Sequence, residues 1–199
     1  MRTLGDLMNY LLPAVVLLST VTLTSCSSLT VDHADGRSPE FVPQEFFSGK
    51  LCADGVVRDR SGAEIRRFNA ELQGEWNDLG EGTLDEVFMF YDEPGADPVR
   101  ETRLWSFTPV TTKNGPALEA SAGDVPEPTI MRWAGNAVYM SYTLRYGQPG
   151  DTIDLHMEDW MFRVSDDVVV NETKMSKFGL HVGQILLVMR RVPDSVSCL

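Results

Sequence analysis

Hydrophobic and polar residues alternate along most of the chain after residue 45. In the stretch EIRRFNAELQGEW, residues 64–76, the side chains of Phe68, Leu72 and Trp76 share one face of an extended chain, with polar residues between them. Successive side chains of a strand point to opposite faces of a sheet, so this period of two predicts a strand with one buried face. No segment keeps a helical period long enough to predict a long helix.

Comparable segments, separated by turn sequences rich in Gly, Pro, Asn and Asp, continue to the end of the chain; the whole set is 46–57, 64–76, 83–95, 99–110, 117–125 (weak), 135–151, 152–164, 168–179 and 182–192. Antiparallel strands joined by short turns close into a barrel or pack as a sandwich, because closure removes exposed edges. We therefore predict an all-β fold, an antiparallel up-and-down barrel of eight to nine strands over residues 46–193, followed by a C-terminal tail over residues 194–199.

The N-terminus departs from this pattern. Arg2 is followed by an apolar run, Leu11 to Leu23, that contains hydroxyl residues and one proline. The run is too short for a comfortable membrane span and is typical of the hydrophobic core of a signal peptide. We expect residues 1–25 to be a signal peptide.

Leu23-Thr24-Ser25-Cys26 ends the apolar run and resembles the lipobox of bacterial lipoproteins. The resemblance implies that Cys26 is lipidated and becomes the mature N-terminus, with residues 26–45 as a polar tether. Several acyl chains on one residue make membrane attachment stable. Ser27 rather than Asp after the cysteine favours the outer membrane of a Gram-negative bacterium, with the domain facing the periplasm. A plain secretory signal with a chance cysteine is the alternative.

The formal net charge is -12 at pH 7. Such a surface is repelled by phosphate backbones, which argues against a nucleic-acid partner. No basic cluster indicates a second membrane contact, so we expect the N-terminal lipid alone to hold the protein to its bilayer.

Two cysteines remain after Cys26. Cys52 lies near the start of the predicted domain and Cys198 is the penultimate residue. In an oxidising periplasm they could form a disulfide, since the first and last strands of a closed barrel are neighbours. Two independent thiols are the alternative.

The stretch DTIDLHMEDWMFRV, residues 151–164, places Asp154, His156 and Glu158 on one strand face. Two such residues could bind a metal ion, but no second His or Cys cluster converges on them, so we predict a solvated outer face and no metal or other cofactor. The opposite face carries Leu155, Met157 and Met161 and is expected to point inward.

Asp159 is a carboxylate on this inward, apolar face. A buried carboxylate must be hydrogen-bonded or paired, or its pKa rises. The turn at residues 165–167 places Asp159 opposite Thr173 or Lys174, with Lys177 as a diagonal partner. Asp159 and Lys177 could form a polar tie that fixes the register of the hairpin. Asp159 could instead be a polar anchor in a ligand cavity or, less in keeping with its surroundings, a catalytic group.

Four sequence pieces, EFFSGKL, DRSGAEIRRF, MEDWMF and MSKFG, resemble a family of uncharacterised Gram-negative lipoproteins. The resemblance spans about residues 40–192 and implies a lipocalin-like barrel. The family has no established activity, so the resemblance implies fold and location and no reaction.

The inward residues define a candidate cavity, formed by Phe68, Leu72, Trp76, Tyr142, Met157, Asp159 and Met161. Methionine and aromatic side chains adapt to irregular apolar guests, although they also pack ordinary cores. The predicted function is therefore binding or carriage of an apolar ligand, such as a fatty acyl or lipid molecule.

An envelope scaffold or assembly factor with a filled barrel, acting through its surface, is the alternative. The sequence contains no GxSxG, HExxH, P-loop or GxGxxG motif, so we expect no enzymatic activity; a lipid-acting enzyme would be a third class.

Overall fold

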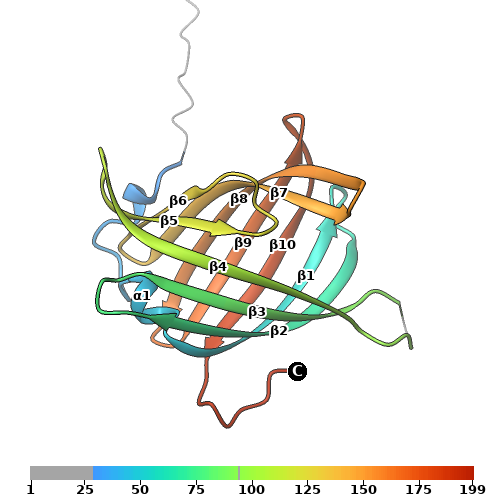
Figure 1. Cartoon of the computed structure of the whole chain (residues 1–199), viewed down its shortest axis with the longest axis horizontal. Coiled ribbons are helices and arrows are strands. Elements are labelled where there is room, and N and C mark those ends of the chain that lie inside the picture. Colours follow the sequence, from blue (N-terminus) through green and yellow to red (C-terminus); the bar gives the residue numbers. More distant parts are fainter. Residues whose placement is uncertain (1–28, 94) are drawn as a thin grey trace, which may run out of the picture.

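The structure is a computed structural model, and it describes residues 29–93 and 95–199. Two short helices precede the strands, and Figure 1 shows the strands wrapped around one axis. The elements are η1 (Val31–Ala34), α1 (Pro43–Phe46), β1 (Gly49–Asp59), β2 (Glu64–Trp76), β3 (Gly82–Tyr91), β4 (Val99–Thr112), β5 (Gly115–Ala122), β6 (Thr129–Ala134), β7 (Ala137–Gln148), β8 (Asp151–Ser165), β9 (Val168–Lys177) and β10 (Leu180–Arg191).

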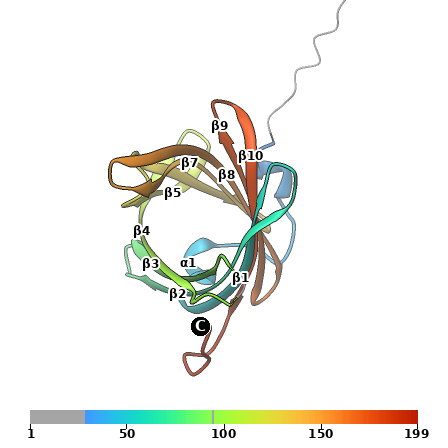
Figure 2. The same cartoon turned by 90° about the vertical axis from the view of Figure 1, so that its right-hand side faces the viewer.

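The strands form one closed antiparallel barrel in which each strand pairs with its neighbours in sequence. β1 and β10 close the ring, in a register that runs from Leu51 opposite Arg191 to Asp59 opposite Gly183. Figure 2 looks along the barrel axis and shows the ring of strands. The all-β, up-and-down architecture is as predicted, but the barrel has ten strands rather than eight to nine.

The strand that the sequence pattern missed is β6, Thr129–Ala134. It has only six residues and follows Pro126 and Pro128 closely. Its one regular feature is that Thr129 and Met131 are buried while Ile130 is exposed. So short an alternation beside two prolines is typical of a loop, and pairing with β5 and β7 makes it a strand.

The segment before β1 was expected to be a tether, and its described part packs against the barrel instead. Val31 and Ala34 are buried where η1 contacts β6 and β7. Phe41 is fully buried, and its backbone N–H donates a 2.7 Å hydrogen bond to the carbonyl of Gly135. Apolar residues spaced among the polar ones make this packing favourable, because each large one removes apolar surface from water. The domain therefore begins well before residue 46.

This segment closes one end of the barrel. Phe41, Phe46 and Phe47 form an aromatic cluster with ring centroids 5.1–5.7 Å apart, and α1 is visible inside the ring in Figure 2. A Cβ atom at Gly74 of β2 would lie 1.5 Å from the Phe47 carbonyl oxygen. Glycine at position 74 therefore lets the cap approach the wall. We call the end of the barrel that this aromatic cluster covers the closed end. The opposite end, where β1 ends and β2 begins, is the mouth.

Inward-facing positions carry the core, as the alternation predicted. Phe68 and Leu72 of β2 are buried, and so are Met157 and Met161 of β8. Cross-strand partners share a face, so Leu72 opposite Leu51 continues the same interior onto β1.

The C-terminal tail folds back along the outside of β1. Cys52 and Cys198 form a disulfide, with Cα atoms 5.2 Å apart and a sequence separation of 146 residues. Cys52 lies on the outer face of β1, because its neighbours Leu51 and Ala53 point inward. The end of the tail is thus tied to the first strand, at the seam where the barrel closes.

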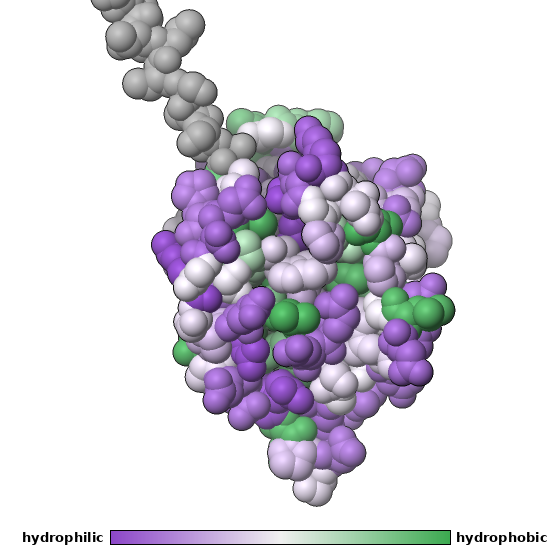
Figure 3. Space-filling view, turned by 90° about the vertical axis from the view of Figure 1, so that its left-hand side faces the viewer, coloured by the Kyte–Doolittle hydropathy of each residue, from purple (hydrophilic) through white to green (hydrophobic). Residues whose placement is uncertain are grey.

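The outside of the closed end is a mixed surface. Figure 3 shows this side as largely hydrophilic, with small separate hydrophobic patches. In the part of the chain that the structure describes, no helix has the length and apolar character needed to cross a membrane.

Candidate functional site in the barrel interior

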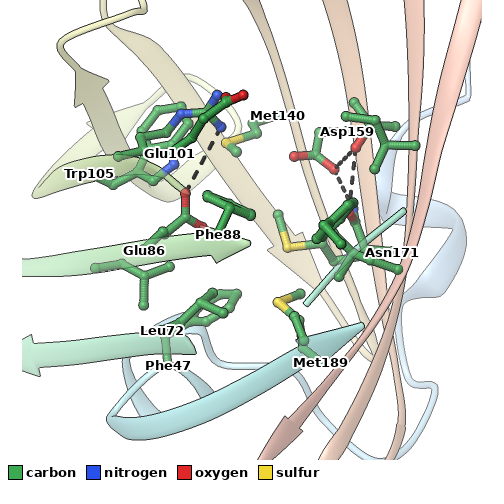
Figure 4. A pocket seen from close by; sticks show the side chains of 18 of the residues that line it. Phe47, Leu72, Glu86, Phe88, Glu101, Trp105, Met140, Asp159, Asn171 and Met189 are labelled. Atoms are coloured by element: carbon green, nitrogen blue, oxygen red, sulfur yellow. Dashed lines mark hydrogen bonds and ion pairs between the residues drawn. The ribbon is translucent and has the colours of Figure 1, made fainter. Parts of the chain in front are cut away.

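A cavity of about 170 Å³ lies inside the barrel, between the aromatic cap and the mouth. Phe47 of the cap forms its floor, and Figure 4 shows apolar side chains such as Leu72 and Met189 on one side of it. Among the other apolar wall residues are Phe68, Phe88, Trp105, Met131, Met140 and Met161. Methionine side chains have several rotatable bonds and can adjust to an irregular guest.

Five of the seven residues predicted for the cavity line it: Phe68, Leu72, Tyr142, Asp159 and Met161. The other two do not. Trp76 lies at the closed end of β2 and stacks on Phe107, with ring centroids 5.4 Å apart. Met157 is 1% exposed and packs within the core beside the cavity. Alternation gives the face of a residue, but its height along the barrel decides whether it reaches the cavity.

One polar group in the cavity wall is the carboxylate of Asp159, which is 7% exposed. Its Oδ1 accepts a 2.9 Å hydrogen bond from the Thr173 hydroxyl and another from the Asn171 amide, both drawn in Figure 4. Burial raises the pKa of Asp159, and the two hydrogen bonds offset part of that rise. The position opposite Asp159 is Thr173, one of the two that the turn predicted.

Lys177 is not the partner of Asp159. It lies four residues beyond Thr173 on β9, which is about 13 Å along a strand. The predicted tie between β8 and β9 therefore exists, but neutral donors make it. Asn171 also donates a 2.9 Å hydrogen bond to the Trp160 carbonyl, so the same side chain fixes the register of the hairpin.

A second polar cluster faces the cavity from β3, β4 and the loop after β5. Arg103 donates from Nε to Asp124 Oδ2 at 2.9 Å, and its Nη2 lies 2.9 Å from the same oxygen. Glu86 is 8% exposed and its Oε2 lies 4.0 Å from Arg103 Nη1, the contact that Figure 4 marks beside Trp105. Burial raises the pKa of Glu86 to about 7, against the opposing effect of Arg103.

Tyr142 lies between the two clusters. Its ring meets Trp105 edge to face at 5.4 Å, and the residue is 7% exposed. Burial raises the pKa of its hydroxyl, and the negative charge of Asp159 raises it further. The phenol therefore stays protonated and can donate a hydrogen bond into the cavity at neutral pH.

Arg66 spans the mouth. Its guanidinium contacts Asp92 Oδ1 at 2.5 Å and Glu101 Oε1 at 2.9 Å, and its Nη1 donates to the Tyr146 hydroxyl at 3.2 Å. Five strand steps separate β2 from β7 in either direction around the ring, so this last contact crosses the barrel opening. The side chain also covers the Phe90 ring, with Cζ 3.7 Å from the centroid.

The sequence interpretation missed Glu86, Arg103 and Arg66, although the signal that revealed Asp159 was present for each. Glu86 alternates with buried Leu84 and Phe90 on β3. Arg103 precedes Trp105 and Phe107 at the same period, and Arg66 precedes Phe68. A charged residue on an otherwise apolar strand face was the common indication.

The outward face of β8 is solvated, as predicted. Asp154 forms a two-point ion pair with Arg145 at 2.8 and 2.9 Å, and Glu158 lies opposite Lys174. His156 is exposed, with Nε2 3.4 Å from the Ser141 hydroxyl. Within residues 29–93 and 95–199 no group of three or more His, Cys, Asp or Glu residues could hold a metal ion.

The predicted signal peptide and Cys26 lie outside the described residues.

Comparison with solved structures finds the same kind of fold. An S-type phycobiliprotein lyase, CPES from Guillardia theta, superposes with a TM-score of 0.53 at 8% sequence identity, over 76% of this chain and 92% of the lyase chain. That protein has a lipocalin-like barrel, which agrees with the predicted fold class. No curated protein matches the sequence.

A family described as a protein of unknown function, DUF3833, matches residues 20–191. The match begins before the first strand and ends with the last, so it covers the cap, the barrel and the cavity. This chain belongs to the DUF3833 family.

Proposed function

We propose that this protein binds a small apolar molecule, or the apolar part of an amphipathic one, inside its barrel. The observation that carries the proposal is the cavity of about 170 Å³ with aromatic and methionine walls and a few polar atoms. Ligand sites in proteins have this composition, an apolar lining with a small number of placed polar groups. The lyase with a similar fold is named for phycobiliproteins, and it supports the proposal by analogy of fold.

The volume limits what enters without rearrangement. Ligand pockets commonly measure about 300–1,000 Å³, whereas a cavity of about 150 Å³ accepts a benzene-sized guest. A longer apolar chain, such as a fatty acyl or other lipid chain, therefore needs side chains to move. Met140, Met161 and Met189 line the cavity and can change rotamer to lengthen it. We propose carriage of such a ligand rather than its chemical conversion.

We further propose that the barrel is held at the outer membrane, facing the periplasm, by acyl chains on Cys26. The Leu23–Cys26 sequence supports the anchor, and the Cys52–Cys198 disulfide supports an oxidising compartment. Labelled palmitate should enter the wild-type protein and be absent from Cys26→Ala. Equal labelling of both proteins would refute the anchor.

Titration with N-phenyl-1-naphthylamine, an uncharged apolar dye, tests the binding proposal. We expect saturable fluorescence enhancement in the wild type and a loss of at least about ten-fold in affinity in Met161→Trp, whose larger side chain fills the cavity. Met89→Trp is the matched control, because Met89 lies on the outer face of β3 between inward-facing Phe88 and Phe90. No saturable binding, or equal loss in both variants, would refute binding in the cavity.

A surface-acting envelope scaffold is the second candidate. It is favoured by a row of aromatic side chains on the outside of the barrel, where Trp160 lies 4.5 Å from Tyr139 and 5.9 Å from Phe162 between ring centroids. If the wild type does not bind the dye and Trp160→Ala impairs the function of the protein in the cell envelope, the results would favour the scaffold over ligand carriage.

A further inference from the structure

The charges around the cavity are unbalanced. Four carboxylates line it, those of Glu86, Glu101, Asp124 and Asp159, and Arg103 is the one cation among the described lining residues. A cavity built for a fatty acid would be expected to offer the carboxylate head a free cation or several N–H donors. This lining offers mainly acceptors.

The available guanidinium groups already have partners. Arg103 contacts Asp124 through both Nε and Nη2 at 2.9 Å. At the mouth, Arg66 contacts Glu101 at 2.9 Å and also Asp92. An incoming carboxylate would have to displace one of these partners and leave a carboxylate unpaired in the barrel, which is costly in a region of low dielectric.

Two carboxylates are left without a close cationic partner. Glu86 is 8% exposed, and its Oε2 accepts no hydrogen bond from the described residues; its nearest cation is Arg103 Nη1 at 4.0 Å. Asp159 is 7% exposed, and the donors on its Oδ1 are the neutral side chains Asn171 and Thr173. The Oδ1 atom of Asp124 is also buried without a hydrogen-bond donor in the described part of the chain. Buried acceptors of this kind are normally satisfied, so their number here requires an explanation.

We propose that the ligand is an amphipathic molecule with a protonated amino group, held by the carboxylates of Glu86 and Asp159 while its apolar part occupies the cavity. The inference rests on the proposed ligand-binding function and narrows the ligand class. An ammonium group has three N–H donors and a positive charge, and it would satisfy the empty acceptors and balance the excess of negative charge. The same charges disfavour a fatty acid of equal length.

The binding of such an amine should strengthen as the pH rises. Glu86, on β3, faces Arg103 of β4, Asp124 in the loop after β5, Tyr142 of β7 and Asp159 of β8. Burial raises its pKa to about 7. Below that pH Glu86 is largely neutral, so it attracts a cation less. An alkylamine stays protonated across this range, because amines of the lysine type have a pKa of about 10.

Displacement of N-phenyl-1-naphthylamine by three probes of equal chain length, octylamine, octanol and octanoate, tests the inference at pH 8.5 and pH 5.5. We expect octylamine to bind at least about ten-fold more tightly than octanoate at pH 8.5, with octanol between them, and the preference to shrink at pH 5.5. Octanoate binding as tightly as octylamine, or a preference that does not depend on pH, would overturn the inference. If the dye itself fails to bind, the proposed function fails and the inference falls with it.

Glu86→Gln should reduce octylamine affinity at pH 8.5 by about ten-fold and leave octanol affinity unchanged. Glu119→Gln is the matched control, because it removes the same charge from an exposed position of β5. If Glu86→Gln does not fold, Asp159→Asn tests the second carboxylate, and the pH dependence of the wild type needs no variant. Equal octylamine affinity in Glu86→Gln and Glu119→Gln would also overturn the inference.

Discussion

The buried carboxyl of Glu86 makes a quantitative prediction about stability and pH. The residue is 8% exposed, and burial is the main cause that raises its pKa from 4.5 to about 7. The folded protein therefore keeps the Glu86 proton up to a higher pH than the unfolded chain does. Between pH 4.5 and about 7 the folded state binds more protons than the unfolded state. Stability must therefore fall as the pH rises through this window.

The magnitude follows from the two pKa values. Each pH unit between them corresponds to about 1.4 kcal/mol, so the interval from 4.5 to about 7 represents about 3 kcal/mol. This contribution is complete below pH 4.5 and lost above about pH 7. Asp159, whose pKa burial also raises, acts on the wild-type stability with the same sign.

Urea unfolding of the wild type and Glu86→Gln, followed by tryptophan fluorescence between pH 4 and pH 9, measures the effect. Glutamine does not titrate, so the variant should gain about 3 kcal/mol relative to the wild type between pH 4.5 and pH 8.5, whatever its offset at a single pH. Glu119→Gln provides the control, since that side chain is exposed. A constant difference between wild type and Glu86→Gln across the range would refute the reasoning.

Three further predictions concern the cap, the seam and the mouth. Gly74→Ala should lower the free energy of unfolding, measured in urea, by at least about 2 kcal/mol, because the added Cβ would meet the Phe47 carbonyl oxygen at 1.5 Å. Gly123→Ala is the control and should change the free energy of unfolding little, because there is open space around Gly123. Cys198→Ser should cost about 2–5 kcal/mol by opening a loop of 146 residues, and equal stability in oxidised and reduced wild type would contradict this. Arg66→Ala should speed dye release several-fold in stopped-flow measurements by opening the mouth, and an unchanged rate would show that the dye leaves by another path.

The barrel class could be predicted from local sequence because its signal is local. Alternation on β2 and β8 needs only a few neighbouring residues to identify the inward face, and Phe68 and Met161 are buried as expected. The same alternation identified Asp159 as a charged residue on an apolar face. It failed for β6, since six residues beside two prolines carry too little alternation to be distinguished from a loop.

The interaction partner of an inward side chain was harder to predict than the strand face on which the side chain lies. Asp159 was expected opposite Thr173 or Lys174, with Lys177 as a diagonal partner. The register of β8 against β9 places Thr173 opposite it and Lys177 about 13 Å away. The register depends on how many residues the turn uses, and a bulge between Arg163 and Ser165 adds one. Local sequence does not determine such a bulge, so the direction of Asp159 was predictable but the choice between Thr173 and Lys174 as its cross-strand neighbour was not.

By itself, the sequence determined that the chain forms antiparallel strands, which residues of most strands face inward, and that one inward residue of β8 is charged. Only the tertiary structure decided that Glu86, Arg103 and Asp124 meet, and that Arg66 crosses the mouth to Tyr146. It also decided that residues 41–47 cap the barrel and that η1 packs against β6 and β7, rather than trailing from the domain. The physical reason is the distance along the chain over which each property is determined. Side-chain alternation is a property of the extended backbone over a few residues, whereas the cavity and its excess of carboxylates arise from ring closure, strand register and height along the barrel, which depend on contacts between residues far apart in the chain.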